Sequence, residues 1–70
     1  MEMISVSSST LAAVGYDSDT ATLCIQFLNG GIYSYQGVPT EVFEGLVSSG
    51  SKGQYFDRII KKGGYPYSKI

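Results

Sequence analysis

The sequence predicts a small α+β domain, in which an antiparallel sheet of three to four strands is followed by two helices packed on one face. Apolar and polar side chains alternate in residues 22–27, which is typical of a strand with one buried face. A second extended segment, residues 31–36, follows after a turn, and residues 38–47 repeat apolar side chains at helical spacing. Seventy residues suit one domain, so we treat residues 1–70 as a single unit.

Two extended segments precede the alternating strand. Ile4 and Val6 have strand spacing, and residues 11–16 form the next apolar segment. Asp17-Ser18-Asp19-Thr20 then has the side chains that favour a turn. Two aspartates at this spacing also begin calcium-binding loops, but the glycine and the distant glutamate of such a loop are missing. We therefore expect a simple turn.

The central hairpin has two possible registers. Asn29-Gly30 predicts the turn, because both residues tolerate positive φ angles, and the next strand carries Tyr33 and Tyr35 on one face. With a two-residue loop, both tyrosines lie away from the apolar face of residues 22–27. If Gly31 joins the loop as a bulge, the pairing slips by one residue and both tyrosines enter the apolar face. The sequence leaves both registers open, with the tyrosines either in the core or on a stacking platform.

The first helix is expected to begin near Pro39. Proline suits a first helical turn, and an acid such as Glu41 suits the positive end of the helix dipole. Gly50 is expected to end the helix in the left-handed conformation. The side chains that should face the sheet are Val42, Phe43, Leu46 and Val47.

The second helix is expected to begin at Ser51. Ser51 and Gln54 have the spacing of a capping box, and an apolar stripe follows. Lys61-Lys62-Gly63-Gly64 should end the helix, with cations at the negative end of the dipole and glycines to stop it. The apolar stripe consists of Phe56, Ile59 and Ile60.

Residues 65–70 form a tail that Pro66 keeps extended. The tail carries two further tyrosines, Tyr65 and Tyr67. We expect these rings either to pack back onto the sheet or to reach a neighbouring subunit.

The charge is distributed unevenly along the chain. Residues 1–50 hold five of the six acidic residues and no basic residue, whereas residues 51–70 hold all five basic residues and only one acid, Asp57. This polarity predicts a localised anion site. A protein that follows long nucleic acid usually has a larger basic excess, so a small anionic ligand or a short single strand fits better.

Several classes of function are disfavoured. Without histidine and with Cys24 as the single cysteine, the chain forms no internal disulfide, and we expect no metal and no cofactor. No nucleophile is paired with a base, so we expect no enzymatic activity. Neither a membrane span nor a signal peptide is apparent, which predicts a cytoplasmic protein without membrane contact. A core this small favours a homo-oligomer.

Ser51-Lys52-Gly53 is the segment that suggests chemistry. At a helix N-terminus, unpaired N–H groups and a lysine favour an anion, and a glycine lets a ligand approach the backbone. The alternative is that Ser51 only caps the helix and Lys52 is solvated. If Tyr33 or Tyr35 lies nearby, the two elements together would form a nucleotide site.

Taken together, Tyr33-Ser34-Tyr35, Val38-Pro39, the segment Ser-Lys-Gly-Gln-Tyr-Phe at residues 51–56, and Tyr65-Pro66 resemble the KTSC domain family. The resemblance covers residues 6–67. It implies a short module found alone in bacterial and phage proteins and at the C-terminus of some lysyl-tRNA synthetases, without assigned enzymatic activity and with a suggested role in RNA binding. The family tends to place an arginine before the Tyr65 position, where this chain has Lys61-Lys62, which keep the charge but lose the bidentate fork.

The function that the sequence predicts is non-catalytic binding of a small nucleotide-type anion by a homo-oligomer, which would sequester a nucleotide signal. The alternatives are a short single-stranded RNA-binding domain and a protein–protein interaction module that uses the tyrosine tail. The expected ligand-binding residues are Tyr33, Tyr35, Ser51, Lys52, Gly53, Tyr55, Arg58, Lys61 and Lys62.

Overall fold

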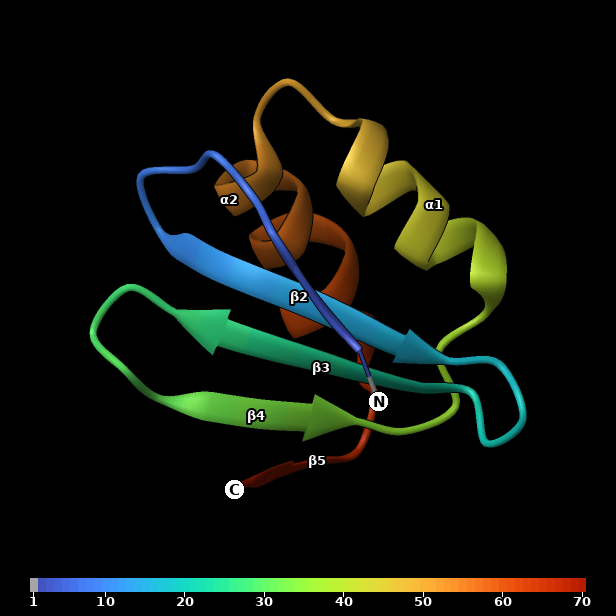
Figure 1. Cartoon of the computed structure of the whole chain (residues 1–70). Helices are drawn as coiled ribbons and strands as arrows, with labels where there is room; N and C mark the ends of the chain where they lie inside the picture. Colours follow the sequence, from blue (N-terminus) through green and yellow to red (C-terminus); the bar gives the residue numbers. More distant parts are fainter. Residues whose placement is uncertain (1) are drawn as a thin grey trace.

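Five strands form one antiparallel sheet in the computed structural model, which describes residues 2–70 (Figure 1). The order in the sheet follows the order in the chain. The strands are β1 (Met3–Ser5), β2 (Leu11–Asp17), β3 (Thr22–Phe27), β4 (Ile32–Tyr35) and β5 (Tyr67–Lys69). The sequence predicts three to four strands; the additional one is β5, which the C-terminal tail forms by pairing with β4 of the same chain. The tail therefore packs back onto its own sheet.

The β3–β4 pairing puts both tyrosines on the apolar face of the sheet. Tyr33 lies opposite Ile25, and Tyr35 lies opposite Leu23. This is the slipped register of the two that the sequence allows. Because the strand period is two, the slip moves both rings from the open face of the sheet to the face that the helices cover.

The β3–β4 loop has three residues, 28–30. The Phe27 N–H donates to the Gly31 carbonyl oxygen over 2.8 Å, so these two residues close the hairpin. Gly30 takes the positive φ of 96°. The extra loop residue is therefore Leu28 and not Gly31, as expected for a turn followed by a left-handed glycine.

The β2–β3 turn is held by side-chain and backbone bonds. The Asp19 N–H donates to Asp17 Oδ1 over 3.0 Å, which confirms the predicted turn. Ala21 then adopts a left-handed backbone with φ 54°. In this conformation its carbonyl oxygen accepts the Val38 N–H over 2.9 Å and connects the turn to the segment before the first helix.

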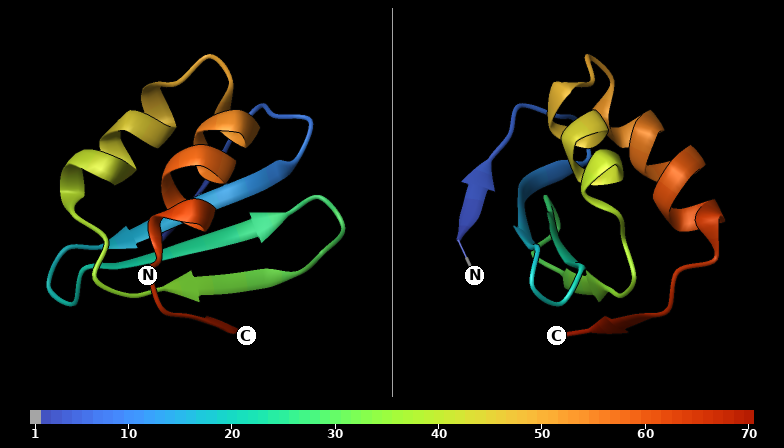
Figure 2. Two further views of the ribbon diagram at one scale, coloured as in Figure 1. Left: turned by 180° about the vertical axis from the view of Figure 1, so that it is seen from behind. Right: turned by 90° about the vertical axis from the view of Figure 1, so that its right-hand side faces the viewer.

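Both helical segments lie on one face of the sheet, as predicted (Figure 2). The first is α1 (Thr40–Ser48). The second begins as α2 (Lys52–Tyr55), widens into a π-helical turn, η1 (Phe56–Ile60), and tightens into a 3₁₀ turn, η2 (Lys61–Gly63). No helix within residues 2–70 is long and apolar enough to cross a bilayer.

Two of the predicted helix caps are wrong and one is confirmed. Ser51 forms no side-chain cap bond, so the capping box is absent. Gly50 is not left-handed; α1 ends instead at Ser49, whose extended backbone stops the helix. Gly64, with φ 78°, ends the second helical segment as expected.

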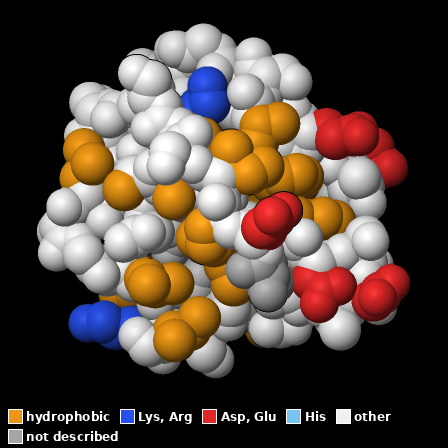
Figure 3. All heavy atoms as spheres, viewed as in Figure 1, with side chains coloured by type: hydrophobic (Ala, Val, Ile, Leu, Met, Phe, Trp, Pro, Cys, Tyr) orange, Lys and Arg blue, Asp and Glu red, His pale blue; other side chains and the backbone are white. Residues whose placement is uncertain are grey.

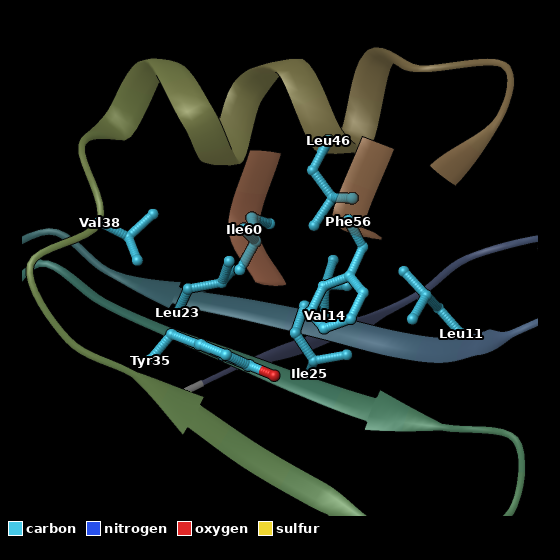
Figure 4. Close-up of a cluster of buried hydrophobic side chains, with 9 residues drawn as sticks. All are labelled: Leu11, Val14, Leu23, Ile25, Tyr35, Val38, Leu46, Phe56 and Ile60. Atoms are coloured by element: carbon cyan, nitrogen blue, oxygen red, sulfur yellow. The ribbon is translucent and has the colours of Figure 1, made fainter. Parts of the chain in front are cut away.

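The core lies between the helices and the sheet (Figure 4). Phe56 and Ile60 point from the second helical segment towards the sheet, but Ile59 is 42% exposed, which contradicts its place in the predicted stripe. The wider π-helical turn puts residues four apart on the same side and rotates Ile59 outwards. The buried cluster consists of Leu11, Val14, Leu23, Ile25, Tyr35, Val38, Leu46, Phe56 and Ile60.

The opposite face of the sheet is not covered by a helix and is viewed in Figure 3. Apolar side chains gather across its middle, and acidic side chains gather at one side. One cross-strand row on this face runs through five uncharged residues, namely Met3, Gly15, Cys24, Ser34 and Ser68.

Candidate functional site

A hollow of about 690 Å³ opens beside the β3–β4 hairpin and the second helical segment. We call it the aromatic hollow. Thr10, Asn29 and Gly53 contribute to its rim, and Lys61 and Asp57 are its charged residues. Its wall is formed by the rings of Phe27, Tyr33, Tyr35, Phe56 and Tyr67.

The rings of this wall support one another. Phe56 meets Phe27 and Tyr35 edge to face, with centroid distances of 5.3 and 5.7 Å. Tyr67 lies over Tyr35 at 5.4 Å, with 31° between the ring planes, and 6.1 Å from Tyr33. These separations are in the range of favourable aromatic pairs, so the wall is a packed surface.

Exposure differs sharply across the wall. Tyr35 is only 6% exposed, whereas Tyr67 is 63% exposed. Burial, followed by the nearby Tyr67 and Tyr33, raises the pKa of the Tyr35 phenol, so its hydroxyl stays protonated. Tyr67 is therefore the ring with the most surface available for stacking.

A second hollow, of about 540 Å³, adjoins the first. It lies between residues 7–10, before β2, and residues 50–54, at the start of α2, and Asp57 and Arg58 also line it. We call it the polar hollow, because hydroxyl side chains dominate its lining. Three residues line both hollows: Thr10, Gly53 and Asp57. These three residues thus lie at the boundary of the two hollows, which we call together the groove.

Lys52 is engaged within the protein. Its Nζ donates to the Ser49 carbonyl oxygen over 2.9 Å and connects the start of α2 to the end of α1. This bond uses one of the three N–H donors of the ammonium, so Lys52 is not the fully solvated side chain of the capping alternative. Arg58, which is exposed, is the other cation of the polar hollow.

Gly53 allows close packing between two segments. A Cβ at this position would lie 3.0 Å from Thr10 Oγ1 and 3.4 Å from Thr10 Cβ. Glycine therefore lets the helix approach the chain before β2, where the two hollows meet. In the folded protein, the Thr10 side chain occupies the space next to Gly53.

The structure brings most of the predicted site residues to this groove but not all of them. Tyr55 packs against Gly45 of α1 and lines neither hollow. Lys62 also lies outside both hollows; its Nζ is 3.6 Å from Asp57 Oδ2, with both side chains largely exposed. The predicted residues that line the groove are Tyr33, Tyr35, Ser51, Lys52, Gly53, Arg58 and Lys61.

Sequence reasoning missed four important lining residues. Phe27 follows from the alternation of β3 once the register is known, and Tyr67 follows from the pairing of β5 with β4. Thr10 and Asp57 carry no local signal, because only the tertiary fold brings them together. These four residues complete the aromatic wall and join the two hollows.

Metal and thiol chemistry find little support here. Within residues 2–70, no three His, Cys, Asp or Glu side chains are grouped to hold a metal ion. Cys24 lies on the uncovered face of the sheet, and burial raises the pKa of its thiol. The reactive thiolate is therefore disfavoured.

The sequence matches a known protein family. The model of the KTSC domain matches residues 7–65. An uncharacterized protein of Stutzerimonas stutzeri is 34% identical over 70 residues, which are 100% of this chain and 99% of that protein. The lysine–tRNA ligase of Trichormus variabilis is 44% identical over 55 residues, which are 79% of this chain and 10% of the ligase.

A solved structure shows the same fold. The crystal structure of a KTSC domain protein from Yersinia pestis superposes with a TM-score of 0.93 and 42% sequence identity. The alignment covers 99% of this chain and 96% of that protein.

Proposed function

The chain belongs to the KTSC domain family, and we propose that it is a non-catalytic binding module for a small nucleotide-type anion. The KTSC domain is a small module that is not a known catalytic domain. The observation that carries the proposal is the aromatic hollow, where five aromatic rings and Lys61 adjoin a hollow lined by hydroxyl groups.

The aromatic wall suits a nucleobase. Base–aromatic stacking contributes about 1–3 kcal/mol per base and accepts any base, because every base has a π face. Tyr67 offers the most exposed ring, and Tyr33 and Tyr35 hold it in place. A base stacked on Tyr67 would cover apolar surface that is exposed to water in the free protein.

The charges of the groove suit one or two phosphates. Lys61 belongs to the aromatic hollow and Arg58 to the polar hollow, and both are exposed. Asp57 lies where the hollows meet and repels a phosphate placed there. We place the base in the aromatic hollow and the phosphate beside Lys61 or Arg58, with the sugar among the hydroxyl groups.

Two substitutions test this placement. Tyr67→Ala should weaken binding of guanosine and adenosine 5′-monophosphate by about tenfold in calorimetry, because a stacked ring is lost. Lys61→Gln should weaken the nucleotides more than the free nucleosides, because only nucleotides carry the phosphate. Lys69→Gln is the charge-matched control, because Lys69 is exposed and lines neither hollow.

The controls decide how the result is interpreted. Lys61 is exposed, so the thermal midpoint of unfolding should change little in Lys61→Gln. Tyr67→Ala also removes the ring contacts with Tyr33 and Tyr35, so a modest decrease in its midpoint is expected. Unchanged affinity in both variants, with the fold intact, would exclude the aromatic hollow as the site.

We also propose that the protein is a cytoplasmic homo-oligomer that sequesters its ligand. The uncharged cross-strand row on the uncovered sheet face supports self-association, because no charge there would need to be desolvated. Native mass spectrometry of the protein purified from cells measures subunit number and retained ligand together. An oligomer with extra mass in the nucleotide range is expected, and a bare monomer would contradict the proposal.

Short single-stranded RNA is the second candidate ligand. It is supported by the relatives named lysine–tRNA ligase, although the matched segment is about a tenth of those proteins. Salt separates the two candidates. For RNA, the logarithm of affinity falls by about 0.7 per neutralised phosphate for each tenfold rise in salt, so a strand with several contacts weakens steeply. A pocket for one phosphate weakens little. Absence of binding to either probe would favour the third reading, a protein-interaction module.

A further inference from the structure

We propose that Asp57 selects a purine with two adjacent N–H donors, the arrangement found in guanine. This inference rests on the proposed nucleotide site and adds the identity of the base. Its basis is that Asp57, an acidic residue, belongs to the lining of both the aromatic hollow and the polar hollow.

The Asp57 carboxylate is placed to meet a ligand. Asp57 directly follows Phe56, whose buried ring belongs to the aromatic wall. The Asp57 side chain is 48% exposed, and Asp57 lines both hollows. A base stacked against the wall therefore presents one edge towards this carboxylate.

The protein leaves most of the bonding capacity of this carboxylate unused. Within residues 2–70, its charged partner is Lys62, at 3.6 Å, and that lysine side chain is 70% exposed. An exposed pair at this distance is screened by water and holds the carboxylate weakly. A carboxylate accepts about four hydrogen bonds, so it needs donors from a ligand when the groove is filled.

The chemistry of the bases then discriminates between ligands. An ionised carboxylate only accepts hydrogen bonds. Guanine offers the ring N1–H and the 2-amino group side by side, which match the two carboxylate oxygens in a bidentate pair. Hypoxanthine lacks the amino group, and adenine places an acceptor nitrogen beside its single amino donor. Uracil flanks its N3–H with two carbonyl oxygens, which repel the carboxylate.

The test compares three nucleotides by isothermal titration calorimetry at fixed salt and pH 7. The probes are guanosine, inosine and adenosine 5′-monophosphate. Wild-type protein should bind the guanosine nucleotide about tenfold more tightly than the inosine nucleotide, because one hydrogen bond to a charged group distinguishes them. The Asp57→Asn variant should reduce this ratio to near one, because the amide presents a donor to the ligand.

Matched variants guard against an indirect effect. Asp19→Asn makes the same chemical change in the β2–β3 turn, outside both hollows, and should keep the wild-type ratio. Asp57→Glu keeps the carboxylate and should keep a preference for the guanosine nucleotide. Thermal unfolding checks that each variant folds.

The outcomes separate this inference from the function on which it rests. If the three nucleotides bind wild-type protein equally, Asp57 does not select the base, but the nucleotide site stands. A preference that persists in Asp57→Asn would assign the selection to another group. If no nucleotide binds wild-type protein, both proposals fail. The comparison of guanosine and inosine nucleotides on wild-type protein remains decisive even if a variant does not fold.

Discussion

Replacing Gly45 by alanine would probe the contact between α1 and α2. A Cβ at this position would lie 2.8 Å from Cζ and 3.0 Å from Cε2 of Tyr55, closer than side chains normally approach. The clash should cost about 1–3 kcal/mol, as other overpacking substitutions do. Alanine in a helix interior also gains about 1 kcal/mol over glycine. In the wild-type background, we therefore expect a net loss of about 1 kcal/mol in the free energy of unfolding.

A double-mutant cycle isolates the clash. In a Tyr55→Leu background the ring is absent, so Gly45→Ala should stabilise the protein by about 1 kcal/mol through helix propensity alone. The two backgrounds should thus differ in sign, with a coupling energy of about 2 kcal/mol. Urea unfolding followed by far-ultraviolet circular dichroism gives each free energy, provided that the denaturant slope is unchanged.

Gly50→Ala is the control, because nothing lies within 4 Å of an added Cβ there and its φ is not positive. Its effect should be the same in both backgrounds. If Gly45→Ala stabilises both backgrounds equally, Tyr55 does not pack as described. The cycle also bears on the site, since a Tyr55 ring held against α1 is not available to a ligand in the groove.

Three further perturbations test the fold. Ala21→Gly should raise the free energy of unfolding by about 0.5–1 kcal/mol, because the left-handed strain of alanine exceeds the extra backbone entropy of glycine. A lower free energy of unfolding in urea would contradict this. Ile60→Ala should cost about 2–5 kcal/mol, whereas Ile59→Ala should cost under about 0.5 kcal/mol, and equal costs would contradict the burial of Ile60 and the exposure of Ile59. Burial raises the pKa of the Tyr35 phenol in the folded protein, so the unfolded chain loses this proton first as the pH rises. The contribution of Tyr35 to the free energy of unfolding is therefore complete below about pH 10 and declines as the pH rises towards the folded pKa. Urea unfolding between about pH 9 and 11 should show a weaker decline for Tyr35→Phe than for wild-type protein, and identical slopes would exclude Tyr35 as the cause.

Local patterns predicted most of the fold correctly. The alternation in residues 22–27, the Asn29-Gly30 turn and the helical stripe of α1 each depend on neighbouring residues, so the sequence alone identifies them. The register of the hairpin does not depend on neighbouring residues alone, so the sequence left it open. Asn29-Gly30 fits a loop of either two or three residues, and packing of the Tyr35 ring against Phe56 favours the longer loop. That contact joins elements far apart in the sequence.

The missing capping box has a local cause, whereas strand β5 depends on the tertiary fold. The pattern of Ser51 and Gln54 is a valid capping box, but the junction is held instead by the bond from Lys52 to the Ser49 carbonyl. The strand β5 has only three residues and no local signature. It exists because β4 presents a free edge, which forms only when the hairpin is complete.

The sequence predicted the candidate site residues that belong to local patterns, but not those that only the tertiary fold brings to the groove. Tyr33 and Tyr35 drew attention as aromatic residues on one strand, and Lys61 as part of the basic end of the chain. Tyr67 and Asp57 reach the groove through long-range pairing and packing. No pattern in a single sequence gives their distance from the tyrosines.

The late position of β5 has a thermodynamic consequence for any ligand that stacks on Tyr67. This strand is attached by three paired residues, all exposed, and the whole helical region separates it from β4 in the chain. Such an edge opens at a lower free energy than the core does. Apparent affinity is the intrinsic affinity multiplied by the fraction of molecules in which β5 is docked. Ligand binding and hydrogen-exchange protection of the last strand are therefore linked, and substitutions that loosen β5 weaken binding without touching the ligand.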